Sequence, residues 1–320
     1  MLDVFFSVDV EIWCDDWNRI DEEFPSAFRK FIYGSTPAGD YGLPYKIKVL
    51  NDHGLPGIFF IEPLFALRFG TDPLAEIVGL VREGGQETQL HLHTEWVDEA
   101  IPPLIEGVNG KRQYLKDFSL EEQTLLIEEG ARLLKQAGSG DFNAFRAGSF
   151  GFNTDTLRAI SANGIPFDSS YNARRFGPES GVMPGIAIEE PIEYLGIYEY
   201  PMTIFRDGTG SLRNAQLTAC SYREMEGLLW QALDSGRKSF MILSHGSELL
   251  NKDNDRPDMV VVDRFRKLCS FLDKNRESFR VRGFKDLQPK LVQQQPAQLT
   301  SPLWRTCGRM AEQAFRMRYR

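Results

Sequence analysis

The sequence predicts an α/β fold with a parallel β-sheet that is closed, or nearly closed, into a barrel. Short apolar segments alternate along the chain with segments in which apolar residues recur at helical spacing. Polar or charged residues directly follow many of the apolar segments. In a β/α barrel the carboxyl ends of the strands converge on one mouth, so we expect these polar residues to meet there.

The first strand is expected at residues 2–11, which are mostly apolar and end in two carboxylates, Asp9 and Glu11. The segment is rich in β-branched and aromatic residues and contains no Gly or Pro, as a central strand requires. Asp9 and Glu11 are two residues apart, so an extended backbone places both side chains on one side. Burying such carboxylates is costly unless their charge is compensated. A metal ion, an arginine or solvent at a barrel mouth could compensate them.

Residues 13–45 are expected to be mostly loop, because glycine and proline recur from Gly34 to Pro44. Loops at the carboxyl ends of barrel strands commonly carry substrate contacts. The aromatic side chains of this segment, Trp13 among them, either contact a substrate or pack the loop onto the domain.

The remaining apolar and periodic segments supply the other strands and helices. Strands are expected at residues 57–61, 88–93, 142–145, 166–168 and 240–243, with short strands at 186–188 and 198–202. Helices are expected at residues 46–52, 73–81, 120–136, 154–163, 221–235 and 259–275. Ser119 and Glu122 have the spacing of a capping box at the start of one of them. We expect residues 1–287 to form one domain.

Composition excludes several classes of protein. The chain has 320 residues, 42% of them hydrophobic, which is enough for a well-packed globular core. Its net charge of −8 argues against general affinity for nucleic acid. Four scattered cysteines without a CxxC pair indicate reduced thiols. No signal-peptide pattern and no apolar run of about 18 residues is present, so we expect a cytoplasmic protein.

Residues 288–320 are expected to be a linker followed by a basic amphipathic tail. The linker contains Gln293 and Pro296, and the tail has five arginines, from Arg305 to Arg320, interspersed with apolar residues such as Trp304. Such a segment either lies on an anionic membrane surface or docks on a partner. It is equally well explained as a solvated helix packed on its own domain.

Three of the four histidines follow or end expected strands. His91, His93 and Glu95 share one strand parity, and His245 follows the strand at 240–243. Imidazole suits Zn²⁺ and related ions when a carboxylate completes the ligand set, so the His-x-His pair is a candidate metal site. His53 precedes Gly54 at a helix end, where an imidazole can cap carbonyls, and we interpret it as structural.

Taken together, these segments resemble the polysaccharide deacetylases with a NodB-type homology domain. The resemblance covers residues 2–287 and consists of five motifs in the same order, with a short helix-to-strand sequence at residues 53–60. The motifs are Ser7-Val8-Asp9-Val10-Glu11, the segment from Gly84 to Trp96, Phe145-Arg146-Ala147-Gly148, Phe167-Asp168-Ser169-Ser170 and Leu243-Ser244-His245-Gly246. Five motifs in order are specific, whereas each alone is weak.

The resemblance implies a distorted (β/α) barrel that removes an acetyl group from an N-acetylated sugar or glycan precursor with the help of a divalent metal, expected to be Zn²⁺. The substrate would be a carbohydrate met as a precursor on the inner side of the membrane. Two departures from the family pattern bear on the site. The first motif reads Asp-x-Glu instead of Asp-Asp, and Glu95 stands where the family has its second histidine, with His93 nearby.

The family roles carry over position by position. Asp9 would be the general base that takes a proton from the attacking water, and Arg146 would hold it ionised. Glu11 and His91 would bind the metal together with His93 or Glu95, and Asp9 and Glu11 could exchange roles. His245 would protonate the leaving amine.

The resemblance also implies supporting roles. Asp168 would orient a neighbour, with His245 as one candidate. Backbone N–H groups near Ser149 and Phe150 are candidates for an oxyanion hole, and Trp13 and Trp96 for substrate contact. A barrel that binds a glycan or partner without turnover, and a hydrolase of a non-sugar amide, are the alternatives.

Overall fold

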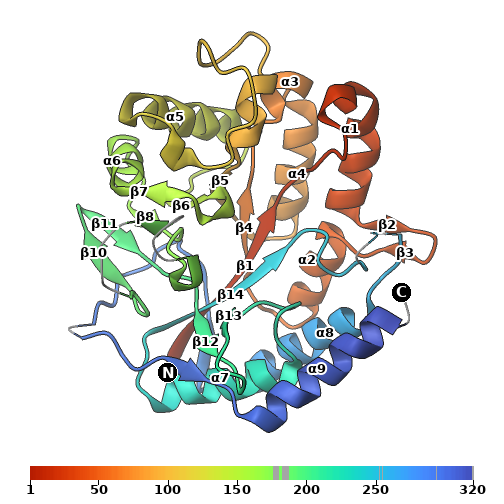
Figure 1. Cartoon of the computed structure of the whole chain (residues 1–320), viewed down its shortest axis with the longest axis vertical. Helices are drawn as coiled ribbons and strands as arrows, with labels where there is room; N and C mark the ends of the chain where they lie inside the picture. The colour runs from red at the N-terminus through yellow and green to blue at the C-terminus, as the bar shows by residue number, and fades with distance from the viewer. Residues whose placement is uncertain (176–179, 182–186, 252, 254, 293, 319–320) are drawn as a thin grey trace. The chain divides into compact units, whose positions relative to one another are not determined.

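The computed structural model describes residues 1–175, 180–181, 187–251, 253, 255–292 and 294–318 (Figure 1). The start of the short strand expected at 186–188, Gln293 of the linker and Arg320 of the tail therefore lie outside the described residues. The chain divides into two compact units. The first unit comprises Met1–Gly57, Thr203–Arg282 and Ala297–Arg320, and the second comprises Ile58–Met202 and Gly283–Pro296.

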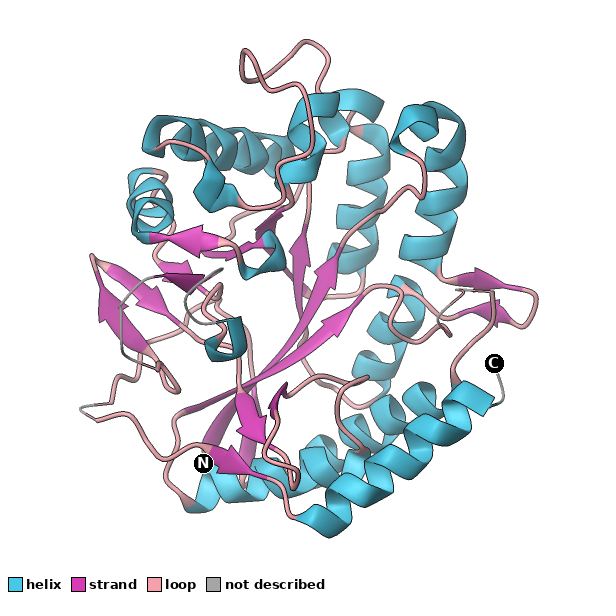
Figure 2. Ribbon diagram, in the orientation of Figure 1, coloured by secondary structure: helices cyan, strands magenta, loops and turns pink. Residues whose placement is uncertain are grey.

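The first unit is organised around β1 (Leu2–Val10), which is buried along its whole length. It pairs in parallel with β14 (Ser239–His245) on one side and with β15 (Phe279–Val281) on the other (Figure 2). The run of apolar residues explains this central position, because a strand paired on both sides and covered on both faces must be apolar throughout. The predicted first strand is confirmed, and the register places Asp9 opposite His245.

Helices and small sheets complete the first unit. The helices are α1 (Ile20–Phe28), α2 (Leu43–Asp52), α7 (Tyr222–Asp234), α8 (Met259–Lys274) and α9 (Leu303–Arg318), with short helical turns at Trp17–Arg19 and Arg29–Tyr33. The small sheets pair β2 (Ser35–Thr36) with β3 (Gly39–Asp40), and β12 (Ile204–Arg206) with β13 (Leu212–Asn214) and β16 (Leu299–Thr300).

The prediction that residues 13–45 are mostly loop was wrong, because α1 lies within them. Ile20, Phe24 and Phe28 recur every fourth residue and are buried, which is the pattern of an amphipathic helix. Three acidic residues from Asp21 to Glu23 occupy its first turn, where their negative charge interacts favourably with the helix dipole.

The second unit contains a mostly parallel sheet in the order β4–β5–β6–β8–β11–β10. All of its adjacent strands are parallel except the pair formed by β10 and β11. The strands are β4 (Ile58–Ile61), β5 (Glu87–Leu92), β6 (Ala144–Ala147), β8 (Phe167–Asp168), β10 (Ile192–Tyr194) and β11 (Ile197–Glu199). A separate bridge pairs β7 (Phe152–Asn153) with β9 (Ser180–Gly181).

Helices connect the parallel strands of the second unit, as the alternating pattern predicts. They are α3 (Ala66–Phe69), α4 (Asp72–Glu83), α5 (Leu120–Gln136) and α6 (Thr154–Ala162), with 3₁₀ turns at Thr94–Glu99, Leu115–Asp117, Gly148–Phe150 and Ala173–Arg175. The capping box of Ser119 and Glu122 forms as predicted. Among the described residues of the chain, no helix is long and apolar enough to cross a membrane.

Candidate active site

The first unit brings Asp9, Glu11 and His245 together at the carboxyl ends of two neighbouring strands. Asp9 and His245 are opposite each other in the parallel register of β1 and β14, and the Gly246 N–H donates to the Asp9 carbonyl over 2.9 Å. One ligand atom from each of the three side chains lies within 4.8 Å of the others. This group can hold a cation, or can place a base and an acid on either side of a reacting atom.

Trp13 positions Glu11 in this group. The Trp13 indole Nε1–H donates to Glu11 Oε2 over 2.9 Å, and the Trp13 ring packs edge-on against Trp17 with centroids 6.3 Å apart. Trp13 is only half-buried. Its indole therefore orients a site carboxylate, which the sequence analysis did not anticipate.

A buried polar network holds the strand end that carries His245. Glu248 accepts hydrogen bonds from Gln216 Nε2 over 2.7 Å, from Thr218 Oγ1 over 2.6 Å and from the His245 N–H over 3.2 Å. The Gln216 amide nitrogen also lies 3.5 Å from His245 Nδ1. Burial alone would raise the pKa of Glu248, but the charges of His245 and Lys46 and these hydrogen bonds outweigh it and lower that pKa.

Lys46 supports the same strand end from α2. Its side chain is fully buried, and Nζ donates to Ser244 Oγ over 2.5 Å and to the His245 carbonyl over 2.6 Å. Burial lowers the pKa of Lys46 to about 8. The sequence did not indicate Lys46 and Gln216, because neither follows an expected strand and only the fold brings them to His245.

The second unit holds His91 and His93 with their rings nearly perpendicular and their centroids 4.8 Å apart. His91 Nδ1 lies 2.7 Å from the Arg146 carbonyl, which can only accept, so Nδ1 carries the proton. His93 Nδ1 lies 3.3 Å from Glu95 Oε2. Because Nδ1 is engaged in both rings, a metal would bind Nε2, and Glu95 orients His93 in the manner of a carboxylate behind a metal histidine.

Glu62 is a further buried acid that the sequence analysis missed. Glu62 directly follows β4, just as Asp9 lies near the end of β1. A charged residue at the end of an expected strand could therefore have pointed to it. Its carboxylate oxygens accept from the N–H groups of Leu64 over 2.7 Å and Phe65 over 3.4 Å. Burial raises the pKa of Glu62 to about 8, so the side chain is mostly protonated at neutral pH.

Arg146 is buried at the end of β6, where its guanidinium lies 4.1 Å above the Phe60 ring. Its Nε donates to the Ser169 carbonyl and its Nη2 to Ser169 Oγ, both over 3.1 Å. The backbone just beyond is strained, because Ser149 and Phe150 adopt φ values of 53° and 59°. The pairing of Arg146 with Asp9 and the oxyanion-hole role of this turn stay predictions.

Trp96 lies in the core of the second unit. It is 1% exposed, and its ring packs edge-on against Phe65 and Phe69 with centroids 6.2 and 6.1 Å away. Neighbouring side chains thus bury Trp96, and its contact with a substrate stays a prediction.

Asp168 and Glu199 form a buried carboxyl pair on the neighbouring strands β8 and β11. Ser170 Oγ donates to Asp168 over 2.6 Å, and the Tyr171 N–H donates to Glu199 over 3.1 Å. Burial and the adjacent Asp168 charge raise the pKa of Glu199 well above its usual range, and burial also raises that of Asp168. Asp168 thus lies beside a carboxyl group whose protonated form is favoured, while its predicted effect on His245 stays a prediction.

The raised pKa of Glu199 predicts a pH-dependent stability. Because the pKa of Glu199 is raised by folding, its contribution to stability is full below the unfolded pKa of about 4.3 and is lost as pH rises through the folded pKa. Glu199→Gln keeps a hydrogen-bond donor without titrating. We expect the stability of the variant relative to the parent chain to increase as the pH rises above about 4.3. Urea unfolding at several pH values would measure this.

Glu193→Gln, at an exposed position on the adjacent β10, is the matched control. It should leave the pH dependence of unfolding unchanged. If the free energy of unfolding of Glu199→Gln varies with pH just as that of the parent chain does, the pKa of Glu199 is not raised by folding.

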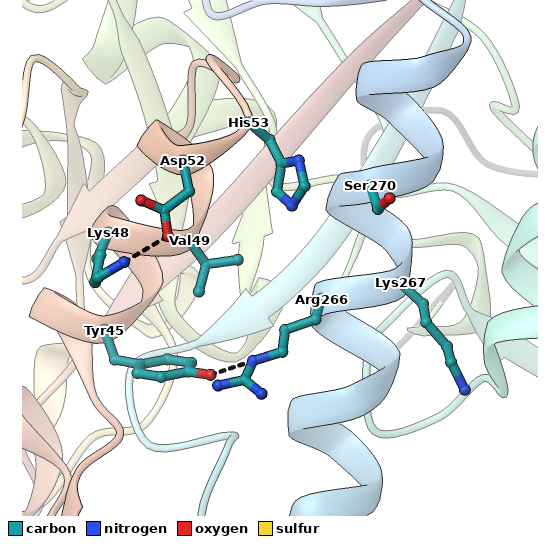
Figure 3. Close-up of a pocket in the computed structure, with 8 residues that line it drawn as sticks. All are labelled: Tyr45, Lys48, Val49, Asp52, His53, Arg266, Lys267 and Ser270. Carbon is teal, nitrogen blue, oxygen red and sulfur yellow. Dashed lines mark hydrogen bonds and ion pairs between the residues drawn. The ribbon is translucent and has the colours of Figure 1, made fainter.

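An open pocket of about 500 Å³ lies between α2 and α8 of the first unit (Figure 3). Its charged groups are largely satisfied: Lys48 pairs with Asp52 over 2.6 Å, and Arg266 Nε donates to the Tyr45 hydroxyl over 2.6 Å. His53, at its rim, pairs with Asp273 over 3.2 Å, in keeping with a structural role. None of the residues that line it belongs to the Asp9–Glu11–His245 group.

Comparison with solved structures confirms the predicted fold class, a distorted (β/α) barrel of the polysaccharide deacetylase type. A protein from Mycobacterium smegmatis assigned as a polysaccharide deacetylase has this fold, with a TM-score of 0.56 and 14% identity over 92% of this chain and 94% of that one. No family model matches the sequence, and no curated protein matches it.

A second enzyme has a similar fold. The 4-α-glucanotransferase of Thermococcus litoralis superimposes with a TM-score of 0.56 and 12% identity, and covers 94% of this chain and 42% of its own. Two enzymes named for different reactions thus resemble the chain equally well, so the reaction must be argued from the site.

Proposed function

We propose that the chain is a metal-dependent hydrolase that removes an acetyl group from an N-acetylated sugar or glycan precursor. The observation that carries the proposal is the group of Asp9, Glu11 and His245, whose ligand atoms lie within 4.8 Å of one another at adjacent strand ends. Amide hydrolysis needs a base for water and an acid for the leaving amine, and this group offers both. The order of the sequence motifs supports the same reaction.

The donor atoms suit a divalent metal. Glu11 offers a carboxylate oxygen, and His91 and His93 each offer Nε2 because Nδ1 is engaged. We propose these three as ligands from their motif positions, with Zn²⁺ as the expected ion. Such an ion would polarise the acetyl carbonyl and lower the pKa of the attacking water.

Asp9 and His245, both in the first unit, would supply the proton transfers. Asp9 would accept a proton from the attacking water, and Arg146 would keep Asp9 ionised, as its motif implies. His245 would donate a proton to the leaving sugar amine. The Glu248 carboxylate beside His245 supplies the negative charge that compensates the imidazolium form, which is the form able to donate.

The test uses the full chain. Elemental analysis of the purified protein should find about one equivalent of a divalent metal, and N-acetylglucosamine oligomers should release acetate in a reaction that a chelator stops and Zn²⁺ restores. Glu11→Gln should lose the metal, whereas Asp15→Asn, at an exposed carboxylate of the next loop, should retain it.

Other outcomes would replace the proposal. Neither metal nor acetate would favour a barrel that binds a glycan or partner without turnover. Metal-dependent hydrolysis of small amides, with sugars untouched, would favour a non-sugar substrate. We also propose that the reaction takes place in the cytoplasm, and fractionation of producing cells would test this.

Gly148 offers a separate test of the histidine pair. A Cβ added at Gly148 would lie 2.7 Å from His93 Nδ1 and 2.6 Å from the Leu92 carbonyl oxygen, so His93 would have to move. We expect Gly148→Ala to weaken metal binding about 10–100-fold, the usual cost of disturbing the groups behind a metal ligand. Titration calorimetry with Zn²⁺ would measure the change.

Gly79→Ala is the matched control, because a Cβ at Gly79 meets nothing within 4 Å and alanine favours the interior of α4. It should bind the metal as the parent chain does. Unchanged affinity in Gly148→Ala would remove His93 from the proposed ligand set.

A further inference from the structure

Helix α9 presents its apolar side to solvent and its polar side to its own unit. Five large apolar residues of α9 are 51–60% exposed: Leu303, Trp304, Met310, Phe315 and Met317. Thr306 and Arg309 of the same helix are fully buried. Surface helices normally have the opposite arrangement, with the apolar stripe against the core.

Polar contacts on successive turns fix this orientation. Arg309 Nη2 pairs with Asp207 over 2.8 Å, and Thr306 Oγ1 accepts from the Gly208 N–H over 2.9 Å. The next turns continue the series, with Glu312 bound to Arg264 and Arg316 bound to Asp258, each over 2.6 Å. Turning the apolar side inward would break all of these contacts and leave buried charges without partners.

The exposed residues form one continuous face. With about 100° per residue, the exposed positions from Leu303 to Arg318 fall on one side of the helix and the contact residues fall on the other. Arg318 is the one charged residue on this outer face within the described part of α9. Figure 1 shows α9 alongside α7 and α8, its contact partners, and Met259 at the start of α8 is 53% exposed next to the Asp258–Arg316 pair.

We propose that this face attaches the protein to the surface of an anionic lipid bilayer. Tryptophan, phenylalanine, leucine and methionine side chains on one side of a helix, with arginines as its main charged residues, are the pattern of helices that lie in a membrane interface. Arg309 and Arg316 pair with Asp207 and Asp258 on the inner side, which leaves Arg305 and Arg318 as the arginines toward the outer face. Arg305 lies at the edge of the face, with its guanidinium 4.9 Å from the Trp304 ring.

Charge complementarity favours this partner over a second copy of the chain. The outer face carries only positive charge in the described part of α9, so it offers no carboxylate that could pair with the Arg318 of a second copy. Anionic headgroups instead attract arginines at the border of an inserted apolar face. The chain as a whole is acidic, with a net charge of −8, so attraction to anionic lipid must come from Arg305 and Arg318 at and beside the outer face.

The experiment measures co-sedimentation of the full chain with phosphatidylcholine vesicles that contain or lack phosphatidylglycerol. We expect binding to the anionic vesicles that weakens as salt is raised, and much weaker binding to the neutral ones. Trp304→Ser combined with Phe315→Ser should reduce binding at least about tenfold, because two aromatic side chains then no longer insert. Circular dichroism and acetate release from a soluble substrate should stay unchanged.

The matched control replaces two exposed leucines elsewhere, Leu125→Ser with Leu291→Ser, which are 39% and 43% exposed. This variant should bind vesicles as the parent chain does. The proposal would be overturned if the parent chain does not bind anionic vesicles. It would also be overturned if the control loses as much vesicle binding as Trp304→Ser with Phe315→Ser. A concentration-dependent dimer seen by analytical ultracentrifugation without vesicle binding, and abolished by Trp304→Ser with Phe315→Ser, would assign the face to self-association. These outcomes do not depend on whether the chain is a deacetylase.

Discussion

Acetate release by an Asp9→Asn variant is expected to be about 10²–10⁴-fold slower than by the parent chain, the usual contribution of a general base. Asparagine keeps the shape of the side chain but cannot accept the proton of the attacking water. The loss should appear in kcat, because Asp9 acts on the reacting water and is not proposed to hold the sugar. Steady-state kinetics on N-acetylglucosamine oligomers would measure it.

Asp3→Asn is a strict control for this variant. Asp3 lies on the same strand as Asp9 and is also buried, but it pairs with Arg280 over 2.6 Å near the other end of β1. Its replacement should lower stability and leave kcat intact. If Asp9→Asn stays active while Glu11→Gln loses activity without losing the metal, the two carboxylates have exchanged roles.

The largest expected effect on stability comes from Arg309→Met, which removes a guanidinium from the buried Asp207. We expect the free energy of unfolding to fall by about 3 kcal/mol. This value is at the lower end of the range for breaking a buried ion pair, because Arg213 still contacts Asp207. Urea unfolding at neutral pH would measure it. Arg318→Met, an exposed change on the same helix, should stay within about 0.5 kcal/mol of the parent chain.

The same pair predicts the direction of a pH effect. Burial alone would raise the pKa of Asp207, but hydrogen bonds from Thr209, Arg213 and Arg309 outweigh it and hold that pKa well below its usual range. A depressed pKa contributes stability above the unfolded value of about 3.9, and this is lost as pH falls toward the folded value. The difference between Arg309→Met and the parent chain should therefore shrink in acid. A constant difference would show that lost packing, not charge, is responsible.

The sequence predicted the central strands because strands buried on both faces are apolar without interruption, as in β1 and β14. It did not predict β15, which has three residues and carries the exposed Arg280 in its middle. It also missed α1, because glycines and prolines later in the same segment suggested a loop.

The candidate site likewise contains residues that the sequence predicted and residues that it did not. Asp9, His91 and His245 were found because each lies at a strand end, where parallel sheets gather polar side chains. Glu62 satisfies the same rule and was overlooked. Gln216 could not be found, because its position beside His245 depends on how distant segments pack, which no local pattern records. The sequence likewise indicated that the tail is amphipathic but not the direction in which the apolar side of α9 points.

The inverted polarity of α9 separates two properties that are usually linked in one helix. Residues that hold the helix to the protein and residues that face outward occupy opposite sides, so substitutions on one side leave the contacts of the other intact. The apolar residues of the outer side can therefore be replaced by polar residues, in evolution or by design, and the chain should still fold. A variant with serine or glutamine at Leu303, Trp304, Met310, Phe315 and Met317 should fold as the parent chain does and be more soluble at high concentration.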